Sequence, residues 1–223
     1  GMTDYQPLSA PDQEPKPATH HTTRHQDQVR ARLPFDDVRS FDNARRGFIA
    51  SLEPLRIAHQ DAERSALDLT AFDFLTDECP DTVNPSLWRQ AQLNAQHHGL
   101  FAVTDGIYQI RSFDIANMTL VRGETGWIVI DPLTCSESSS AALKLANAHL
   151  GHREVVAVIH THSHVDHFAG ILGVTDQASV SSGRVQVIAP LDFVDEALNE
   201  NVLAGNVMGR RATYMYGNLL PAS

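Results

Sequence analysis

The run Val155–Ile159 constrains the fold most, because its five consecutive residues, VVAVI, are all apolar. Short continuous apolar runs are typical of strands that are buried on both faces of a sheet. A second such run, VQVIAP, follows at 185–190. The polar stretch HTHSHVDH begins directly after the first run. The pattern therefore predicts a buried sheet with a histidine-rich loop at the C-terminal end of one strand.

The flanking patterns predict an α/β fold class, with helices covering a largely buried sheet. Three short apolar or alternating runs between 101 and 132 are separated by glycine-containing turns, which predicts a three-stranded meander. The predicted helices span 35–50, 84–99 and 136–151, and two further pieces lie within 191–217. The segment 67–75 fits either a strand or a turn of helix. This order of elements is typical of a layered α/β domain.

Capping signals support two of these helices. Asn84 and Pro85 are typical of an N-cap and a first helical position, and Gly151 is typical of a helix stop after a serine-capped start. His97 and His98 lie in the last turn of the helix at 84–99, where a partly charged imidazole interacts favourably with the helix dipole. That role is preferred here over metal binding.

Composition excludes several classes of function. The chain has 223 residues and a formal net charge of -10, so general nucleic-acid binding and attraction to anionic membranes are not expected. A local metal ion can still attract an anionic substrate to an acidic protein. No apolar run approaches the roughly 18 residues of a membrane span. Cys79 and Cys135 form no CxxC pattern, so neither a disulfide scaffold nor a thiolate zinc site is predicted.

The N-terminal residues 1–33 are polar and proline-rich, and they are predicted to form an extended or disordered arm. The rest of the chain, 34–223, is predicted to form the folded domain. The arm includes His20, His21 and His25, which are expected to be solvated. No secretory signal is visible at the start, and the compartment stays unknown.

The histidine cluster has the spacing of a metal site. Residues two apart on an extended loop point the same way, so His162 and His164 can converge on one metal, whereas Asp166 and His167 turn toward a second. Imidazole and carboxylate ligands suit zinc, and also iron or manganese. Two metals about 3.5–4 Å apart would bind a bridging water and lower its pKa, which gives a hydroxide nucleophile at neutral pH. His160 is predicted to pack in the core or behind the ligands.

Longer stretches around the cluster resemble one family. HxHxDH after an apolar strand resembles the metallo-β-lactamase superfamily of αββα sandwiches. From about Leu33 to Pro221 the chain resembles the N-terminal catalytic region of the alkyl sulfatases, the sodium dodecyl sulfate hydrolase type. The stretches that carry this resemblance are DTVNPSLWRQAQLN, GLFAVTDGIYQIRSFDIANMTLVRGETGWIVIDPL, VVAVIHTHSHVDHFAGILGV and NENVLAGNVMGRRATYMYGNLLP.

The resemblance implies zinc-dependent hydrolysis of alkyl sulfate esters by a metal-activated water. It implies that His162 and His164 bind a first zinc and that Asp166 and His167 bind a second, with Asp166 in the catalytic step. Asp131, which ends the run GWIVI, is expected either to support the ligands from behind or to cap a helix. An arginine in the family-like stretches could pair with a sulfate oxygen, although a packing or surface role is the preferred interpretation of the polar residues there. These residues are Asn117, Asn199, Asn201, Arg210, Arg211 and Tyr214.

The chain also departs from the family pattern. The family takes further ligands from a later segment of the type AENATHNLHN, whereas this chain has no histidine after His167. The resemblance therefore implies approximately the first half of the sandwich, a truncated enzyme with weak or absent zinc binding by itself. A second copy is expected to cover the open faces as a homodimer. Family members are often secreted or periplasmic.

Two alternatives stay open. Another hydrolase of the same fold, such as a lactonase or a thioesterase, would use the same cluster on a different substrate. A non-catalytic remnant that folds or dimerises without a complete metal site would explain the missing later ligands.

Overall fold

The computed structural model describes residues 16–60, 65–76 and 78–199, with the side chain of Ala71 excepted. Its main sheet has seven strands in the order β1-β4-β5-β6-β7-β8-β9, and β2 and β3 form a separate antiparallel pair. The strands are β1 (Phe48–Ala50), β2 (Arg56–Ala58), β3 (Ser65–Asp68), β4 (Gly99–Thr104), β5 (Ile107–Arg111), β6 (Met118–Arg122), β7 (Trp127–Ile130), β8 (Val155–Ile159) and β9 (Gln186–Ile188).

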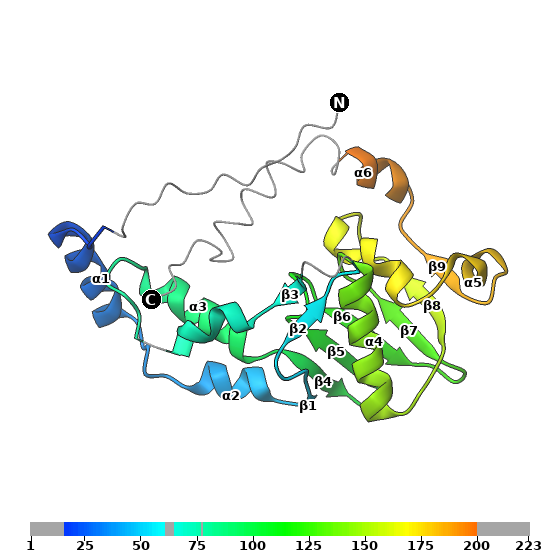
Figure 1. Cartoon of the computed structure of the whole chain (residues 1–223), viewed down its shortest axis with the longest axis horizontal. Helices are drawn as coiled ribbons and strands as arrows, with labels where there is room; N and C mark the ends of the chain where they lie inside the picture. The colour runs from blue at the N-terminus through cyan, green and yellow to red at the C-terminus, as the bar shows by residue number, and fades with distance from the viewer. Residues whose placement is uncertain (1–15, 61–64, 77, 200–223) are drawn as a thin grey trace.

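Nine helical segments accompany these strands in the described residues. They are α1 (His20–Arg32), α2 (Arg39–Arg45), η1 (Thr70–Thr76), α3 (Pro85–Gln96), α4 (Ser136–Leu150), η2 (Val165–His167), η3 (Ala169–Gly173), α5 (Gln177–Ser181) and α6 (Phe193–Asn199). Helix α4 lies across one face of the sheet, with α1 to α3 toward the β1 edge and α5 and α6 toward the β9 edge (Figure 1). No described helix has both the length and the hydropathy that crossing a membrane requires.

The direction of the strands changes at β7. From β1 to β7 each neighbouring pair is antiparallel, whereas β7, β8 and β9 run parallel. Helix α4 makes the crossover from β7 to β8, since parallel neighbours require such a connection. The C-terminal ends of β7 and β8 therefore lie side by side, with Ile130 paired to Ile159. This edge of the sheet positions the histidine loop.

The core lies between the sheet and α4. Trp127, Met118 and Val129 are fully buried, and α4 packs Ala142 and Ala146 against the sheet. The indole Nε1 of Trp127 donates to Asn147 Oδ1 (2.8 Å), so its polar atom is satisfied inside the core. Removing these apolar side chains from water fixes α4 on the sheet and with it the loops at the C-terminal ends of β7 and β8.

Local signals predicted several elements correctly. Helix α3 begins after Asn84, whose side chain accepts from the N–H groups of Ser86 and Leu87, and it has Pro85 at its first position. Helix α4 ends at Gly151, which has φ +90°, a conformation that glycine adopts without strain. The segment 67–75, left open between strand and helix, contains the end of β3 and most of η1.

Other expectations about elements were wrong. The segment predicted as a three-stranded meander contains a fourth strand, because Asp105 and Gly106 turn the first run into the β4–β5 hairpin. The N-cap of α4 is Cys135, with no side-chain hydrogen bond, rather than a serine. The strand predicted as buried, β9, is exposed because it forms the edge of the sheet.

Helix α1 corrects the expectation of an extended or disordered arm for residues 20–32. Its first turn is capped by Thr19, whose hydroxyl accepts from Thr22 N–H (3.2 Å). Contacts distant in sequence hold it: Gln26 is buried, and Arg30 donates to the carbonyl of Cys79 (3.3 Å). Polar composition did not reveal this docking. Residues 1–15 of the predicted arm lie outside the described residues.

Candidate metal centre

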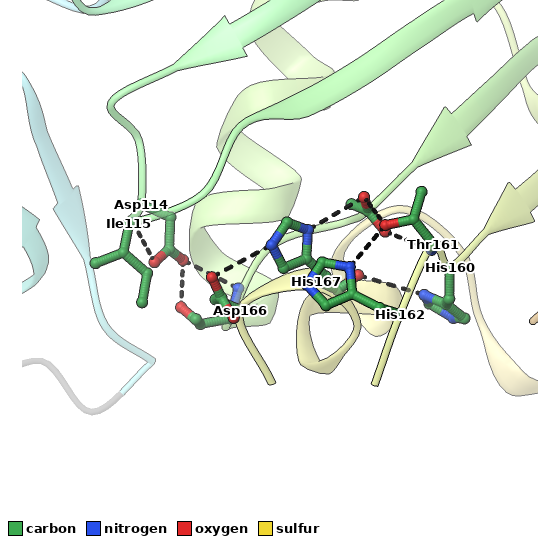
Figure 2. Close-up of polar contacts among 9 residues, drawn as sticks. Asp114, Ile115, His160, Thr161, His162, Asp166 and His167 are labelled. Carbon is green, nitrogen blue, oxygen red and sulfur yellow. Dashed lines mark hydrogen bonds and ion pairs between the residues drawn. The ribbon is translucent and has the colours of Figure 1, made fainter. Parts of the chain in front are cut away.

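The candidate site lies where β7 and β8 end. Asp131 directly follows β7, and its N–H donates to the carbonyl of Ile159 at the end of β8 (2.9 Å). The histidine loop starts at the next residue, His160, so parallel pairing brings the carboxylate and the imidazoles together (Figure 2). Groups that follow adjacent parallel strands commonly form such sites at the C-terminal edge of a sheet.

Asp131 anchors the loop. It is 8% exposed and has φ +55°, a left-handed conformation that aspartate tolerates better than most residues. Its carboxylate accepts from Thr161 N–H (2.9 Å) and from Thr161 Oγ1–H (2.7 Å). Charged acceptors form the stronger class of hydrogen bond, so this pair ties the start of the histidine loop to the end of β7.

The Thr161 hydroxyl also selects a tautomer of His162. Because its only proton is donated to Asp131, Thr161 Oγ1 can act toward His162 Nδ1 (2.8 Å) only as an acceptor. His162 Nδ1 therefore carries the proton, and Nε2 keeps a lone pair. A carboxylate that fixes a histidine tautomer in this indirect way is a common support for metal ligands.

His167 lies between two carboxylates. Its Nδ1 is 3.1 Å from Asp131 Oδ2, and its Nε2 is 3.4 Å from Asp166 Oδ2 (Figure 2). Nδ1 is buried, yet it has no hydrogen-bond partner among the described residues, so the contact with Asp131 is not aligned as a hydrogen bond. The buried nitrogen of His167 and the carboxylate oxygen of Asp131 lie close together without a hydrogen bond between them, so both can act as ligands of a cation.

The donor set fits a zinc-like ion. Donor atoms of Asp131, His162 and His167 all lie within 4.8 Å of one another. Two ligand atoms that are each about 2.1 Å from a tetrahedral zinc are about 3.4 Å apart, so the 3.1 Å separation of Asp131 and His167 needs little adjustment. Two imidazoles and one carboxylate also form a ligand set that catalytic zinc uses.

The predicted ligands are only partly brought together. His162 and His167 are in this group, whereas His164 is exposed and touches His162 through an edge-on ring contact of 4.7 Å. Among the ion pairs of the described residues, Asp166 has one partner, His167. Assignment of His164 and Asp166 as ligands therefore stays a prediction. The sequence predicted only a supporting or capping role for Asp131. Its position directly after β7, the strand next to β8, could have indicated that it belongs to the group of candidate metal ligands.

His160 has a different environment from the other histidines. It is 6% exposed, its ring stacks on Phe193 of α6 at 5.2 Å, and its Nδ1 lies 3.3 Å from the carbonyl of His167. Burial lowers its pKa below the usual value, against smaller opposing effects of the His167 carbonyl and Asp131. His160 therefore packs beneath the loop, and it is not in the donor group.

Two contacts support the site from outside. Gly170 donates its N–H to the carbonyl of Leu133 (2.6 Å), which holds η3 against the residues that follow Asp131. On the other side, Ser163 Oγ donates to Glu196 of α6 (3.3 Å). Asn199 ends α6, while Asn201, Arg210, Arg211 and Tyr214 lie outside the described residues.

Comparison with known proteins identifies the class. Residues 111–221 match the family model of the metallo-beta-lactamase superfamily. The chain is similar to this superfamily over 111 of its 223 residues, and the mixed α/β fold expected from the sequence is confirmed.

Over most of its length, the chain is similar to alkylsulfatases. A linear primary-alkylsulfatase of a Pseudomonas species is 50% identical over 212 residues, which cover 92% of this chain and 31% of the relative. The alkyl/aryl-sulfatase BDS1 of Saccharomyces cerevisiae is 47% identical, over 88% of this chain and 30% of the relative. The structure of the inverting sec-alkylsulfatase Pisa1 from Pseudomonas sp. matches with a TM-score of 0.84 at 43% identity, over 94% of this chain and 33% of that protein. The chain thus spans about a third of the length of these relatives.

Proposed function

We propose that this chain contributes to the metal-dependent hydrolysis of alkyl sulfate esters. One observation carries the proposal. A chain that is similar to alkylsulfatases over most of its length has three side chains that could bind a metal ion, and they lie at the C-terminal ends of its parallel strands. Asp131, His162 and His167 supply its donor atoms. The names of three relatives, two from Pseudomonas and one from yeast, support a sulfate ester as the substrate class.

The proposed metal is zinc, with two ions when the donor set is complete. Bound zinc supplies an acidified water at neutral pH and positive charge toward the sulfate oxygens. Asp131, His162 and His167 hold the metal, and Asp131 also keeps His162 in the required tautomer through Thr161. Asp166, half-buried beside His167, is proposed to accept the proton of the attacking water. His164 is proposed as a further ligand after rotation of its exposed side chain.

We further propose that this polypeptide by itself binds zinc weakly. The described residues bring three donor side chains to one point, and water would fill the remaining positions of each ion. An incomplete set of protein ligands lowers affinity, because a larger share of the coordination is exchangeable solvent.

Self-association is proposed as a homodimer through the β9 edge. Ile188 of β9 is 50% exposed and Leu191 is 92% exposed, and Val194 and Leu198 of α6 are also exposed. An edge strand with exposed apolar side chains favours pairing with another chain. Sedimentation equilibrium of the wild type against Leu191→Lys tests this; a monomer at every concentration contradicts it.

The function is tested by the release of sulfate from dodecyl sulfate with added zinc. His162→Ala and His167→Ala are expected to abolish release, and His149→Ala, an exposed histidine on α4, is the matched control. Nitrocefin and a lactone are assayed in parallel, because turnover of either one without sulfate release would favour another hydrolase of this superfamily. Zinc bound with no turnover of any substrate would favour the non-catalytic alternative.

Zinc binding provides a readout that does not depend on turnover. Equilibrium dialysis at neutral pH is expected to show weak binding that the His167→Ala substitution reduces further. Tight binding of two zinc ions per chain would refute the proposal of weak affinity. Equal zinc binding by the wild type and by both histidine variants would refute the proposed site.

A further inference from the structure

Three aromatic rings form a cluster behind the histidine loop, and each comes from a different segment. His160 starts the loop at the end of β8, Phe168 directly follows its last histidine, and Phe193 is the first residue of α6. The Phe193 ring stacks on His160, with ring centroids 5.2 Å apart and an angle of 18° between the planes, and it meets Phe168 edge-on at 5.3 Å. One ring of α6 therefore contacts both ends of the loop.

The three rings have the geometry of attractive pairs. Stacked and edge-on aromatic rings with centroids about 4.5–7 Å apart attract one another beyond the effect of burial alone. His160 and Phe168 also meet edge-on, at 6.3 Å, so each ring of the cluster touches the other two. The imidazole of His160 is buried among them, and the stack with Phe193 fixes the plane of that imidazole.

Helix α6 has a second contact with the loop. Ser163 Oγ, in the middle of the loop, donates to Glu196 (3.3 Å). Ala197, one turn after Phe193, is buried, whereas Val194 is exposed. Residues four apart share one face of a helix, so α6 turns the face with Phe193 toward the protein.

The buried imidazole of His160 holds a ligand residue by its backbone. A carbonyl oxygen can only accept, so His160 Nδ1 carries a proton and donates to the carbonyl of His167 (3.3 Å; Figure 2). The N–H of His167 is used within the loop, where it donates to the carbonyl of His164 (3.0 Å). His160 is itself fixed, because its N–H donates to the carbonyl of Ile188 in β9 (2.8 Å). The carbonyl of His167 is thus the backbone group that ties this residue to the sheet.

The position of His167 matters for the group of candidate ligands. Its Nδ1 lies 3.1 Å from Asp131 Oδ2 without a hydrogen bond, a spacing that suits two ligands of one ion. Functional groups must be held within about 0.5 Å of their working positions. Rotation of the peptide that follows His167 would swing the imidazole away from Asp131. A group that restrains this peptide therefore also restrains the donor pair.

We propose that Phe193 is a positioning residue of the metal centre. By stacking on His160, the Phe193 ring keeps the Nδ1–H of that imidazole on the carbonyl of His167. The His167 imidazole thereby stays beside Asp131. Phe193 supplies no ligand, so metal affinity depends on a helix that lies outside the donor group. The inference rests on the proposed function and adds a residue that supports its site.

Zinc affinity tests this role with matched variants. Phe193→Ala is expected to weaken zinc binding in equilibrium dialysis by about 10–100-fold, and Phe193→Tyr, which keeps the ring, is expected to restore most of it. Phe48→Ala is the matched control, because Phe48 also pairs with one ring, that of Phe101 at 5.4 Å, but lies on β1 at the opposite edge of the sheet. It should bind zinc as the wild type does. Equal zinc affinity in the wild type and in folded Phe193→Ala would overturn the inference.

A double substitution tests the route through His160. His160→Leu keeps an apolar side chain but removes the donor to His167, so a further Phe193→Ala substitution should weaken zinc binding by no more than about twofold. Losses of affinity that multiply, as they do for independent sites, would overturn the route.

NMR of the metal-free protein separates this inference from the proposed function. The signals of the His160 Nδ1 proton and of the His167 imidazole should shift in Phe193→Ala and stay unchanged in Phe48→Ala. If these signals shift as expected but the wild type binds no zinc, the positioning of His167 by Phe193 is supported and the proposed metal function fails. If zinc binds and the His167 signals are the same in the wild type and in Phe193→Ala, the function stands and the inference is refuted.

Discussion

Replacing Asp131 should separate its structural role from its effect on His162. In Asp131→Ala both hydrogen bonds from Thr161 are lost, and alanine occupies a left-handed conformation that costs it about 1 kcal/mol. Hydrogen bonds to charged groups contribute about 1.5–3 kcal/mol each, and Thr161 is exposed enough for water to replace part of that. The expected destabilisation is about 3 kcal/mol, a fall in Tm of roughly 6–12 °C for a domain of this size.

Asp131→Asn is the sharper variant. Asparagine tolerates the left-handed backbone and can still accept from Thr161 N–H, so the loss of stability should be about 1 kcal/mol. Its amide NH₂, however, would donate to Thr161 Oγ1, which would then donate to His162 Nδ1. That reversal moves the imidazole proton to Nε2 and removes the lone pair meant for the metal. Zinc affinity should fall by at least about 10–100-fold, because asparagine also replaces the anionic donor that Asp131 supplies to the metal.

Two measurements check this reasoning. Nitrogen-15 NMR of the histidine side chains reports which nitrogen of His162 carries the proton, and dialysis reports zinc affinity. Asp192 is a matched control, because it has φ +62° and is exposed, so Asp192→Ala isolates the backbone cost. An unchanged tautomer and unchanged zinc affinity in Asp131→Asn would refute the proposed relay. An equal loss of stability in Asp131→Ala and Asp192→Ala would refute the estimate for the hydrogen bonds.

Three further outcomes follow from the geometry. Burial lowers the pKa of His98 below 6.5, so in this pH range the unfolded chain binds more protons at His98 than the folded chain does. The free energy of unfolding therefore falls as the pH drops below about 6.5. Urea unfolding should show a shallower dependence of stability on pH for His98→Gln than for the exposed control His149→Gln. A Cβ on Gly170 would lie 2.0 Å from a backbone carbonyl oxygen, so Gly170→Ala should cost over about 2 kcal/mol in the same assay, more than Gly183→Ala, where space is open. Asn84→Ala removes the cap of α3 and should cost about 1 kcal/mol; an unchanged urea midpoint would contradict the capping role.

Elements with strong local signals were predictable from the sequence. Asn84 and Pro85 define the start of α3, because an N-cap side chain and a fixed φ act within one turn. The run VVAVI was correctly interpreted as a strand for a similar reason, since apolar β-branched residues favour a buried sheet. Helix α1 was missed because polar composition does not reveal that Gln26 becomes buried or that Arg30 bonds to the carbonyl of Cys79, 49 residues away.

The sequence by itself determined the chemistry available at this site: a buried strand ending in closely spaced histidines and an aspartate, within stretches that resemble alkyl sulfatases. Only the tertiary structure decided which side chains meet. Parallel pairing of β7 with β8 places Asp131 against His167 and Thr161, and spacing along one loop cannot encode a partner that arrives from the neighbouring strand. The exposure of β9 was likewise decided by strand order, because burial of a strand depends on what lies beside it.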